Sequence, residues 1–298
     1  MAKRRLDTLL AERGLFPSRS RAAASVMAGE VRIGGPDGRR AAKPGEMVDD
    51  EQPVTLEQRR TFVSRGGVKL ANALDASGLS VGGRRALDVG ASTGGFTDCL
   101  LQRGAREVIA VDVGYGLIDY ALRRDERVQL LERTNARSLT AAQLPAPRAS
   151  GCADDALPDL ATVDVSFISL AKVLGAVVAC LQDRHDVLAL IKPQFELGRG
   201  RVGKGGVVRD ADLRREALLS VGEAALALGA RVNGYYSSGL PGPKGNRETF
   251  IWLSSSGGAP AQGANELEPL AREVEPASGS TGIAAMPDAR TRADGVKP

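Results

Sequence analysis

The sequence has few of the side chains that bind metals or form nucleophile–base pairs. Its only histidine is His185, and its three cysteines, Cys99, Cys152 and Cys180, lie far apart. A Ser–His–Asp arrangement or a multi-histidine metal site would depend on that one histidine, and the cysteine spacing fits neither a disulfide framework nor a CxxC metal site. We therefore expect no metal ion and a reducing compartment, with Cys99 packed on the apolar face of a helix.

Long hydrophobic runs are also missing. No stretch of about 18 apolar residues occurs, and that is the length needed to cross a bilayer. The chain starts MAKRRLDTLLAERG, which is charged throughout rather than apolar. The sequence thus predicts neither export nor a membrane span, and we expect a cytoplasmic protein. The net charge of +4 is compatible with a polyanionic partner without demonstrating one.

Residues 1–60 read as a small basic α+β unit. A short amphipathic helix carrying Leu6, Leu9 and Leu10 ends at Gly14, and Ser18 is placed to cap a second helix over residues 19–28. Strands are predicted at residues 31–33 and 54–56. The ordered stretches LDTLLAERG, SRSRAAASVMAGEVRIGG and KPGEMV resemble the S4 RNA-binding domain.

The S4 resemblance implies that basic side chains of the second helix and its surroundings follow the backbone of structured RNA. Guanidinium groups match phosphate geometry, and the candidates for phosphate contact are Arg4, Arg5, Arg19 and Arg21. For any single arginine, a solvated helical face is an equally good interpretation. The resemblance therefore supports the module more than each residue in it.

The remaining chain divides into a linker, a larger α/β domain and a tail. Residues 61–65 are predicted to link the two domains. Residues 66–255 alternate strand-like apolar runs with helical stretches, which is typical of a doubly wound parallel sheet, and the last two runs lack an intervening helix and are expected to pair antiparallel at one sheet edge. Residues 256–298 are rich in Ala, Gly, Pro and Ser and are predicted to be a disordered tail, with a helical turn near residues 267–274.

A glycine-rich turn, ALDVGASTGG, follows the first of these strands and opens a helix. Such turns bring backbone N–H groups close to nucleotide-like ligands. The spacing lacks the Lys-Ser/Thr of a phosphate-binding loop and does not match G-x-G-x-x-G. It does fit the S-adenosylmethionine loop of Rossmann-like class I methyltransferases, in which an acidic residue precedes small residues. A tight turn in a cofactor-free domain is the alternative.

The candidate cofactor residues come from this loop and from the end of the next strand. Asp88 is suited to the cationic groups of S-adenosylmethionine, and Asp112 is placed to accept hydrogen bonds from ribose hydroxyls. The full set predicted to bind the cofactor is Asp88, Gly90, Ser92, Gly94, Gly95, Phe96 and Asp112.

Four charged residues are expected at the ends of elements, where the active sites of open sheets gather. They are Lys69, Asp164, Lys192 and Glu248. Lys192 ends the apolar run LALI, and a partly desolvated lysine can take a proton from an alcohol. The stretch Asp-Val-Ser-Phe lacks an Asn-Pro-Pro-Tyr/Phe motif for amino methylation and a cysteine nucleophile for carbon methylation, so oxygen is the preferred acceptor.

These four residues are similar to the Lys-Asp-Lys-Glu tetrad of FtsJ/RrmJ-like ribose 2′-O-methyltransferases. Together with SRGGVKL, VDVSFISL, IKPQFELGR and GNRETF, residues 5–254 resemble the TlyA family. The resemblance implies methylation of ribosomal RNA, within ribosomal subunits, on the 2′-oxygen of cytidine, with Lys192 and Asp164 acting on the hydroxyl and Lys69 and Glu248 completing the site.

Two other functions and two further expectations stay open at this point. The family name hemolysin A suggests a membrane-active protein, and the S4 module also fits a non-catalytic ribosome-assembly factor. The glycine-rich basic loop over residues 198–209 is interpreted as an RNA-side lid or a plain flexible loop. A monomer is favoured, although the sequence does not determine the oligomeric state.

Overall fold

The computed structural model describes residues 3–35, 37–56, 61–148, 157–203, 205–257 and 262–276, and Cys152 lies outside these ranges. The chain separates into two units, with the boundary between Thr61 and Phe62. Each unit is described by itself below.

The first unit is a small α+β fold around two antiparallel sheets. Strand β1 pairs with β4, and β2 lies between β3 and β5. Its elements are β1 (Lys3–Arg5), α1 (Leu6–Glu12), α2 (Arg19–Met27), β2 (Val31–Ile33), β3 (Arg39–Arg40), β4 (Met47–Asp49) and β5 (Val54–Leu56).

Local signals in this unit act as predicted. The Ser18 hydroxyl accepts a hydrogen bond from the backbone N–H of Arg21, which caps α2. Leu6, Leu9 and Leu10 are fully or almost fully buried and pack with Val26 in one apolar core. The predicted α+β organisation is confirmed.

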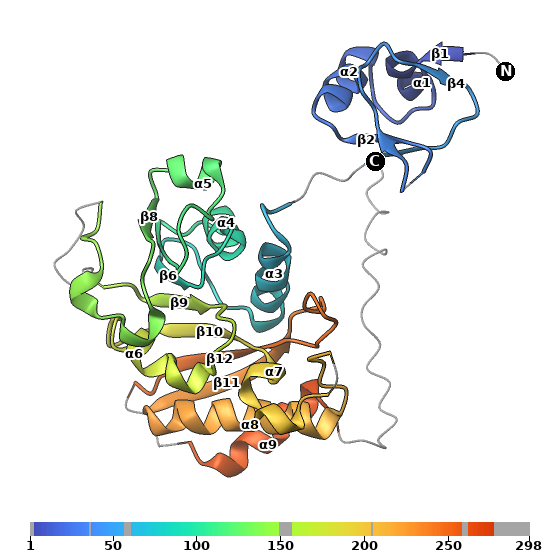
Figure 1. The fold of residues 1–298 in the computed structure, drawn as a ribbon. Helices are drawn as coiled ribbons and strands as arrows, with labels where there is room; N and C mark the ends of the chain where they lie inside the picture. Colours follow the sequence, from blue (N-terminus) through green and yellow to red (C-terminus); the bar gives the residue numbers. More distant parts are fainter. Residues whose placement is uncertain are drawn as a thin grey trace, which may run out of the picture. The chain divides into compact units, whose positions relative to one another are not determined.

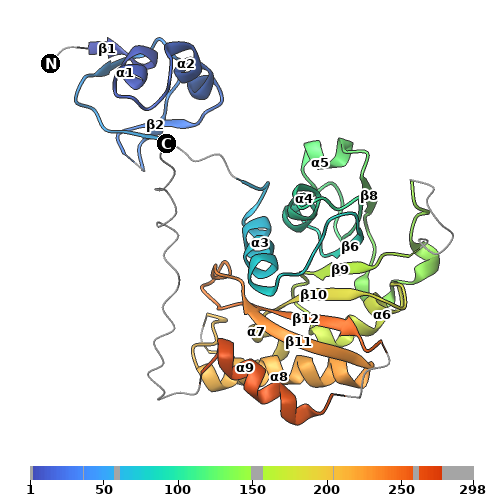
Figure 2. The ribbon, with the colours of Figure 1, turned by 180° about the vertical axis from the view of Figure 1, so that it is seen from behind.

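The second unit is a seven-stranded sheet covered by helices on both faces (Figures 1 and 2). Its main elements are α3 (Arg65–Ser77), β6 (Arg85–Val89), α4 (Gly95–Gln102), β7 (Glu107–Val111), α5 (Tyr120–Arg124), β8 (Val128–Leu131), β9 (Leu160–Val163), α6 (Leu174–Val178), β10 (Asp186–Ile191), α7 (Pro193–Glu196), α8 (Ala211–Ala227), β11 (Ala230–Ser237), β12 (Thr249–Ser255) and α9 (Leu267–Val274).

The strand order across this sheet is β11-β12-β10-β9-β6-β7-β8. Strands β6 to β10 pair in parallel, whereas β12 is antiparallel to both of its neighbours. The predicted doubly wound sheet and its antiparallel edge are confirmed. The chain runs outward from β6 through β7 to β8 and then returns to the other side of β6 at β9. This reversal opens a crevice at the carboxyl ends of β6 and β9, where open α/β sheets bind ligands.

Alternation along the strands assigns side chains to the two helical layers. In β6, Leu87 and Val89 join the core under α6, α8 and α9, whereas Ala86 joins the core under α3 and α4. Asp88 lies between Leu87 and Val89, so its side chain points toward the α3–α4 layer. Cys99 of α4 is fully buried in that layer, as expected for a packing residue.

The two ends of the predicted domain need correction. Phe62, predicted to lie in the linker, is only 9% exposed and packs into the α3–α4 core, and Val63 N–H donates to Asp98 at 2.8 Å. The tail predicted from residue 256 contains α9, because Leu267 and Ala271 are fully buried against the sheet. The helical turn expected near residues 267–274 is thus this helix, in which Leu267, Leu270, Ala271 and Val274 recur at helical spacing and pack against the core. Residues 277–298 lie outside the described ranges.

Candidate active site

The glycine turn after β6 brings two strand ends into close contact. Gly90 has a φ of 86°, and a Cβ atom built there would lie 2.5 Å from the carbonyl oxygen of Asp164, at the end of β9. Any other residue would therefore clash with the neighbouring strand as well as adopt a disfavoured backbone conformation. Gly94 has a φ of 92°, and a Cβ atom built there would clash with the side chain of Leu122.

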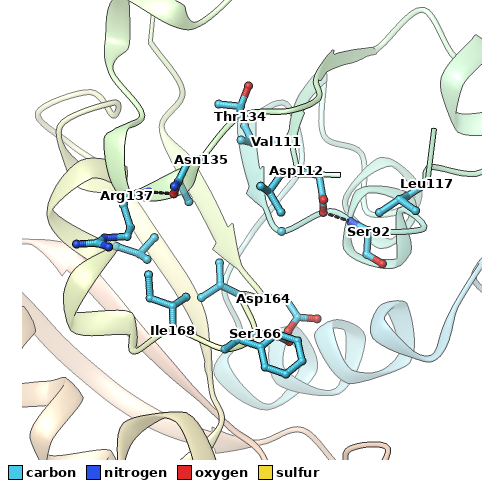
Figure 3. Close-up of a pocket in the computed structure, with 16 residues that line it drawn as sticks. Ser92, Val111, Asp112, Leu117, Thr134, Asn135, Arg137, Asp164, Ser166 and Ile168 are labelled. Atoms are coloured by element: carbon cyan, nitrogen blue, oxygen red, sulfur yellow. Dashed lines mark hydrogen bonds between the residues drawn. The ribbon is translucent and has the colours of Figure 1, made fainter. Parts of the chain in front are cut away.

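A pocket of about 380 Å³ opens beside this turn, at the carboxyl ends of β6, β7, β8 and β9 (Figure 3). Three residues predicted to bind the cofactor line it, namely Gly90, Ser92 and Asp112, and so does the predicted catalytic residue Asp164. The walls also carry apolar side chains such as Ile168. The predicted ligand crevice thus coincides with a real cavity.

Asp112 occupies the position expected for a residue that binds ribose hydroxyls. It follows β7, and its Oδ2 accepts the backbone N–H of Ser92 at 2.8 Å while Oδ1 accepts that of Gly114 at 2.7 Å (Figure 3). These two bonds fix the carboxylate at the pocket wall and leave further lone pairs for a ligand. Because the pocket combines a close-approach glycine, a fixed acceptor and apolar walls, the residues present fit a nucleoside-containing cofactor.

Asp88 lies elsewhere than the sequence predicted. It is fully buried beneath the turn, and its carboxylate accepts hydrogen bonds from Thr97 Oγ1 at 2.7 Å and Thr162 Oγ1 at 3.0 Å. Burial raises the pKa of Asp88 to about 7. Thr162 pairs with Asp88 in the sheet register, so the carboxyl group connects β6, β9 and α4 rather than facing the pocket.

The other residues of the loop that were predicted to bind the cofactor pack against the protein rather than line the pocket. Gly94, Gly95 and Phe96 are absent from the residues that line the described pocket. Phe96 is 3% exposed, and its ring lies 5.7 Å from that of Phe250. A Cβ at Gly95 would lie 2.1 Å from Ser64 Oγ, so this glycine allows α3 to approach the start of α4.

Several pocket residues escaped the sequence analysis. Asn135 and Arg137 come from the short 3₁₀ helix after β8, and Asn135 Oδ1 accepts the backbone N–H of Arg137 at 3.0 Å (Figure 3). Phe167 lines the pocket with a φ of 66° and is 91% exposed. An Asn that caps a helical turn after a strand was the one available signal for this wall of the pocket.

The four predicted catalytic residues form two ion pairs. Lys192 Nζ lies 2.6 Å from Asp164 Oδ1 and donates to Ser166 Oγ at 2.8 Å. On α3, Lys69 Nζ lies 2.5 Å from Glu248 Oε2. Both lysines are 8% exposed. Buried cations of this kind need a nearby anion, and each has one.

Sheet topology explains why these residues meet. Lys192 follows β10, whose last residue, Ile191, pairs with Thr249, the first residue of β12. Glu248 immediately precedes Thr249, so the antiparallel pairing of β12 brings it to the edge where Lys192 lies. Asp164 follows β9 at that same edge, and it also lines the pocket. Lys192, predicted to be catalytic, is thereby linked through Asp164 to the wall of the ligand cavity.

In the first unit, three of the four candidate RNA-binding arginines pair with acidic side chains. Arg5 and Arg19 both contact the buried carboxylate of Asp7, at 2.8 and 3.2 Å, and the hydrogen bond from Arg5 is the main cause of an Asp7 pKa well below its usual range. Arg4 pairs with Glu12 of α1. Sequence reasoning missed Asp7, which fixes two of the arginines while each remains about half exposed.

Metal ligands and membrane spans were also sought in the described residues. Across those ranges, no group of three or more His, Cys, Asp or Glu side chains is arranged to hold a metal ion. No described helix is both long enough and apolar enough to cross a membrane.

Comparison with known proteins places both units in families. A model of the FtsJ-like methyltransferases matches residues 62–255, and a model of the S4 domain matches residues 4–54. The 16S/23S rRNA (cytidine-2′-O)-methyltransferase TlyA of Mycobacterium tuberculosis strain H37Rv is 50% identical over 85% of this chain and 91% of its own length.

Two other relatives carry a hemolysin name. Hemolysin A of Brachyspira hyodysenteriae is 36% identical over 82% of this chain and 97% of its own. A solved structure of a "putative hemolysin" from Streptococcus thermophilus is 38% identical, covers 92% of this chain and 96% of its own, and superposes with a TM-score of 0.65. The chain therefore belongs to the FtsJ-like methyltransferases and, within them, to the S4-containing TlyA and hemolysin A relatives.

Proposed function

We propose that this protein methylates the 2′-oxygen of a cytidine ribose in ribosomal RNA, on a ribosomal subunit, with S-adenosylmethionine as cofactor. The observation that carries the proposal is the Lys192–Asp164 pair, because Asp164 belongs both to the pair and to the cofactor pocket. A hydroxyl group held at Lys192 would therefore lie next to the pocket.

The residues present suit each part of this reaction. When bound, S-adenosylmethionine supplies an activated methyl group. Gly90 permits close approach of the ligand to the backbone, and the Asp112 carboxylate would hold the ribose hydroxyls. Lys192 Nζ, in the unprotonated form that this step requires, would accept the proton of the bound 2′-hydroxyl, and the ammonium group formed would pair with Asp164 Oδ1, 2.6 Å away.

The Lys69–Glu248 pair and the pocket would orient the RNA nucleotide relative to the methyl donor. Lys69 and Glu248 lie at the same edge of the sheet and would keep the nucleotide aligned with the pocket. Fixing a hydroxyl and a methyl donor in line supplies a large part of the rate, because the encounter is then intramolecular. The S4 unit, whose Arg5 and Arg19 are held by Asp7, would provide the affinity for the RNA backbone.

The test is transfer of a labelled methyl group to isolated ribosomal subunits, followed by mapping of 2′-O-methylated nucleotides. In Lys192→Ala, loss of a positioned acid–base group should lower the rate constant about 10²- to 10⁴-fold. Cofactor affinity should stay unchanged, because Lys192 is not a residue of the pocket wall. The exposed Lys172→Ala is the matched control. A Lys192→Ala protein that keeps the wild-type rate would refute the mechanism, and leakage of liposomes by the purified protein would favour the hemolysin alternative.

A further inference from the structure

Residues 262–276, which follow the FtsJ-like region, contact the sheet and α8 at both ends of this described range. At its beginning, Gln262 pairs with the backbone of Val232 on the edge strand β11, accepting its N–H at 2.7 Å and donating to its carbonyl at 3.1 Å. In between, Leu267 and Ala271 of α9 are fully buried. At its end, Glu275 is 3% exposed although it is charged. A buried carboxylate needs a partner that compensates its charge.

That partner is Arg214 of α8, which is also buried. Its Nε and Nη2 donate to the two oxygens of Glu275, each at 2.7 Å. Such a fork-to-fork pair is the strongest common geometry for an arginine and a carboxylate, and it fixes the plane of the guanidinium group. Glu275 therefore determines where the remaining nitrogen of Arg214 points.

The remaining nitrogen holds the loop that precedes α8. Arg214 Nη1 donates to the carbonyl oxygen of Arg209 at 2.6 Å and to that of Val208 at 3.3 Å. Val208 is itself 3% exposed and packs with Leu197 and Ala217 in a small separate core. Residues 205–209 of the glycine-rich loop are thus held to α8 by the hydrogen bonds of Arg214.

The same loop is bound from the other side by the turn that carries a catalytic residue. Val208 N–H donates to Asn246 Oδ1 at 2.9 Å, and Asn246 Nδ2 donates to the carbonyl of Gly206 at 2.7 Å. Asn246 is 2% exposed and lies two residues before Glu248, the partner of Lys69. A series of buried and partly buried hydrogen bonds therefore runs from Glu275 to Asn246, and the chain then continues for two residues to Glu248.

We propose that Glu275, acting through Arg214, is a positioning residue for the catalytic edge: it fixes the 205–209 loop and thereby the Asn246 turn and the Glu248–Lys69 pair. The proposal rests on the proposed function for its catalytic readout. It assigns the C-terminal helix to the working methyltransferase unit, beyond the region that matches the family.

The experiment replaces the buried pair by apolar residues in the full-length chain, as Arg214→Met with Glu275→Leu. Replacing both partners of a buried ion pair leaves folds intact or more stable in known cases. The double variant nevertheless lacks the guanidinium donors to Val208 and Arg209. The matched control is Arg272→Met with Glu273→Leu, which makes the same chemical changes at exposed positions of α9.

Two measurements decide the result. Hydrogen–deuterium exchange at the Val208 amide should become about tenfold faster or more, because its bond to Asn246 opens locally. At saturating substrates kcat should fall about 10- to 100-fold with unchanged cofactor affinity, since a misplacement of about 1 Å has that order of effect. The control should match the wild type in both. If the double variant does not fold, Glu275→Gln, which keeps one acceptor oxygen, is measured in its place with the same two expectations.

Unchanged exchange at Val208 would overturn the inference, and so would faster exchange with an unchanged kcat, because the pair would then have a purely structural role. A wild-type protein without methyl transfer would instead refute the proposed function. The exchange measurement separates the two failures, because it does not depend on activity.

Discussion

The buried carboxyl group of Asp88 should make the second unit less stable as the pH rises. Its folded-state pKa is raised to about 7 by burial, although Thr97 and Thr162 donate hydrogen bonds that partly favour the charged form. Below about pH 4 the group is protonated in both the folded and the unfolded chain, so it contributes nothing to the pH dependence. Between pH 4 and 7 the unfolded chain ionises first, and the free energy of unfolding falls.

The size of this effect follows from the shift. Raising the pKa of Asp88 from 3.8 to about 7 corresponds to about 4 kcal/mol. Between pH 5 and pH 8 the free energy of unfolding is expected to fall by about 2–3 kcal/mol because of this group. In Asp88→Asn this contribution disappears. The free energy of unfolding of the variant should therefore gain about 2–3 kcal/mol relative to the wild type between pH 5 and pH 8, whatever the other groups contribute.

Urea unfolding at pH 5 and pH 8 measures this difference. The single tryptophan, Trp252, lies on β12, so its fluorescence reports on the second unit alone. Asp183→Asn, at an exposed position, serves as the control for the loss of one carboxylate. If the free energy of unfolding changes by the same amount in Asp88→Asn and in the wild type between the two pH values, burial does not raise the pKa of Asp88, and the prediction is wrong.

Two further predictions concern the pocket and the RNA-binding unit. Gly90→Ala should lower the free energy of unfolding by about 1–3 kcal/mol or more and abolish cofactor binding, measured by calorimetry. Gly245→Ala is the control for backbone strain alone, because Gly245 has a φ of 90° but no atom lies within 4 Å of the added Cβ. An equal loss of stability in Gly90→Ala and Gly245→Ala would contradict a clash with Asp164. Arg21→Ala should weaken rRNA binding and reduce the slope of log K against log salt by about one, and an unchanged slope would remove Arg21 from the interface.

Much of the fold could be predicted from the sequence because its signals are local. Ser18 capped its helix, the alternation of apolar runs indicated the parallel sheet, and two final runs without an intervening helix indicated the antiparallel edge. At α9 the sequence indicated a helical turn, but it did not indicate that this helix packs against the sheet domain. Leu267 and Ala271 are apolar in a polar stretch, and their burial depends on a surface formed by α8 and β11.

In the candidate site, too, the residues could be named from the sequence, whereas their contacts required the structure. The sequence by itself indicated Asp164, Lys192 and Glu248 next to strand ends, together with the glycine turn. It also named Lys69, which lies within α3 rather than at the end of an element. Only the tertiary structure decided their partners, because Lys69 and Glu248 are 179 residues apart and meet where α3 packs beside β11, the strand that pairs with β12. It also turned Asp88 away from the pocket, since the two-residue period of β6 directs that side chain toward α4.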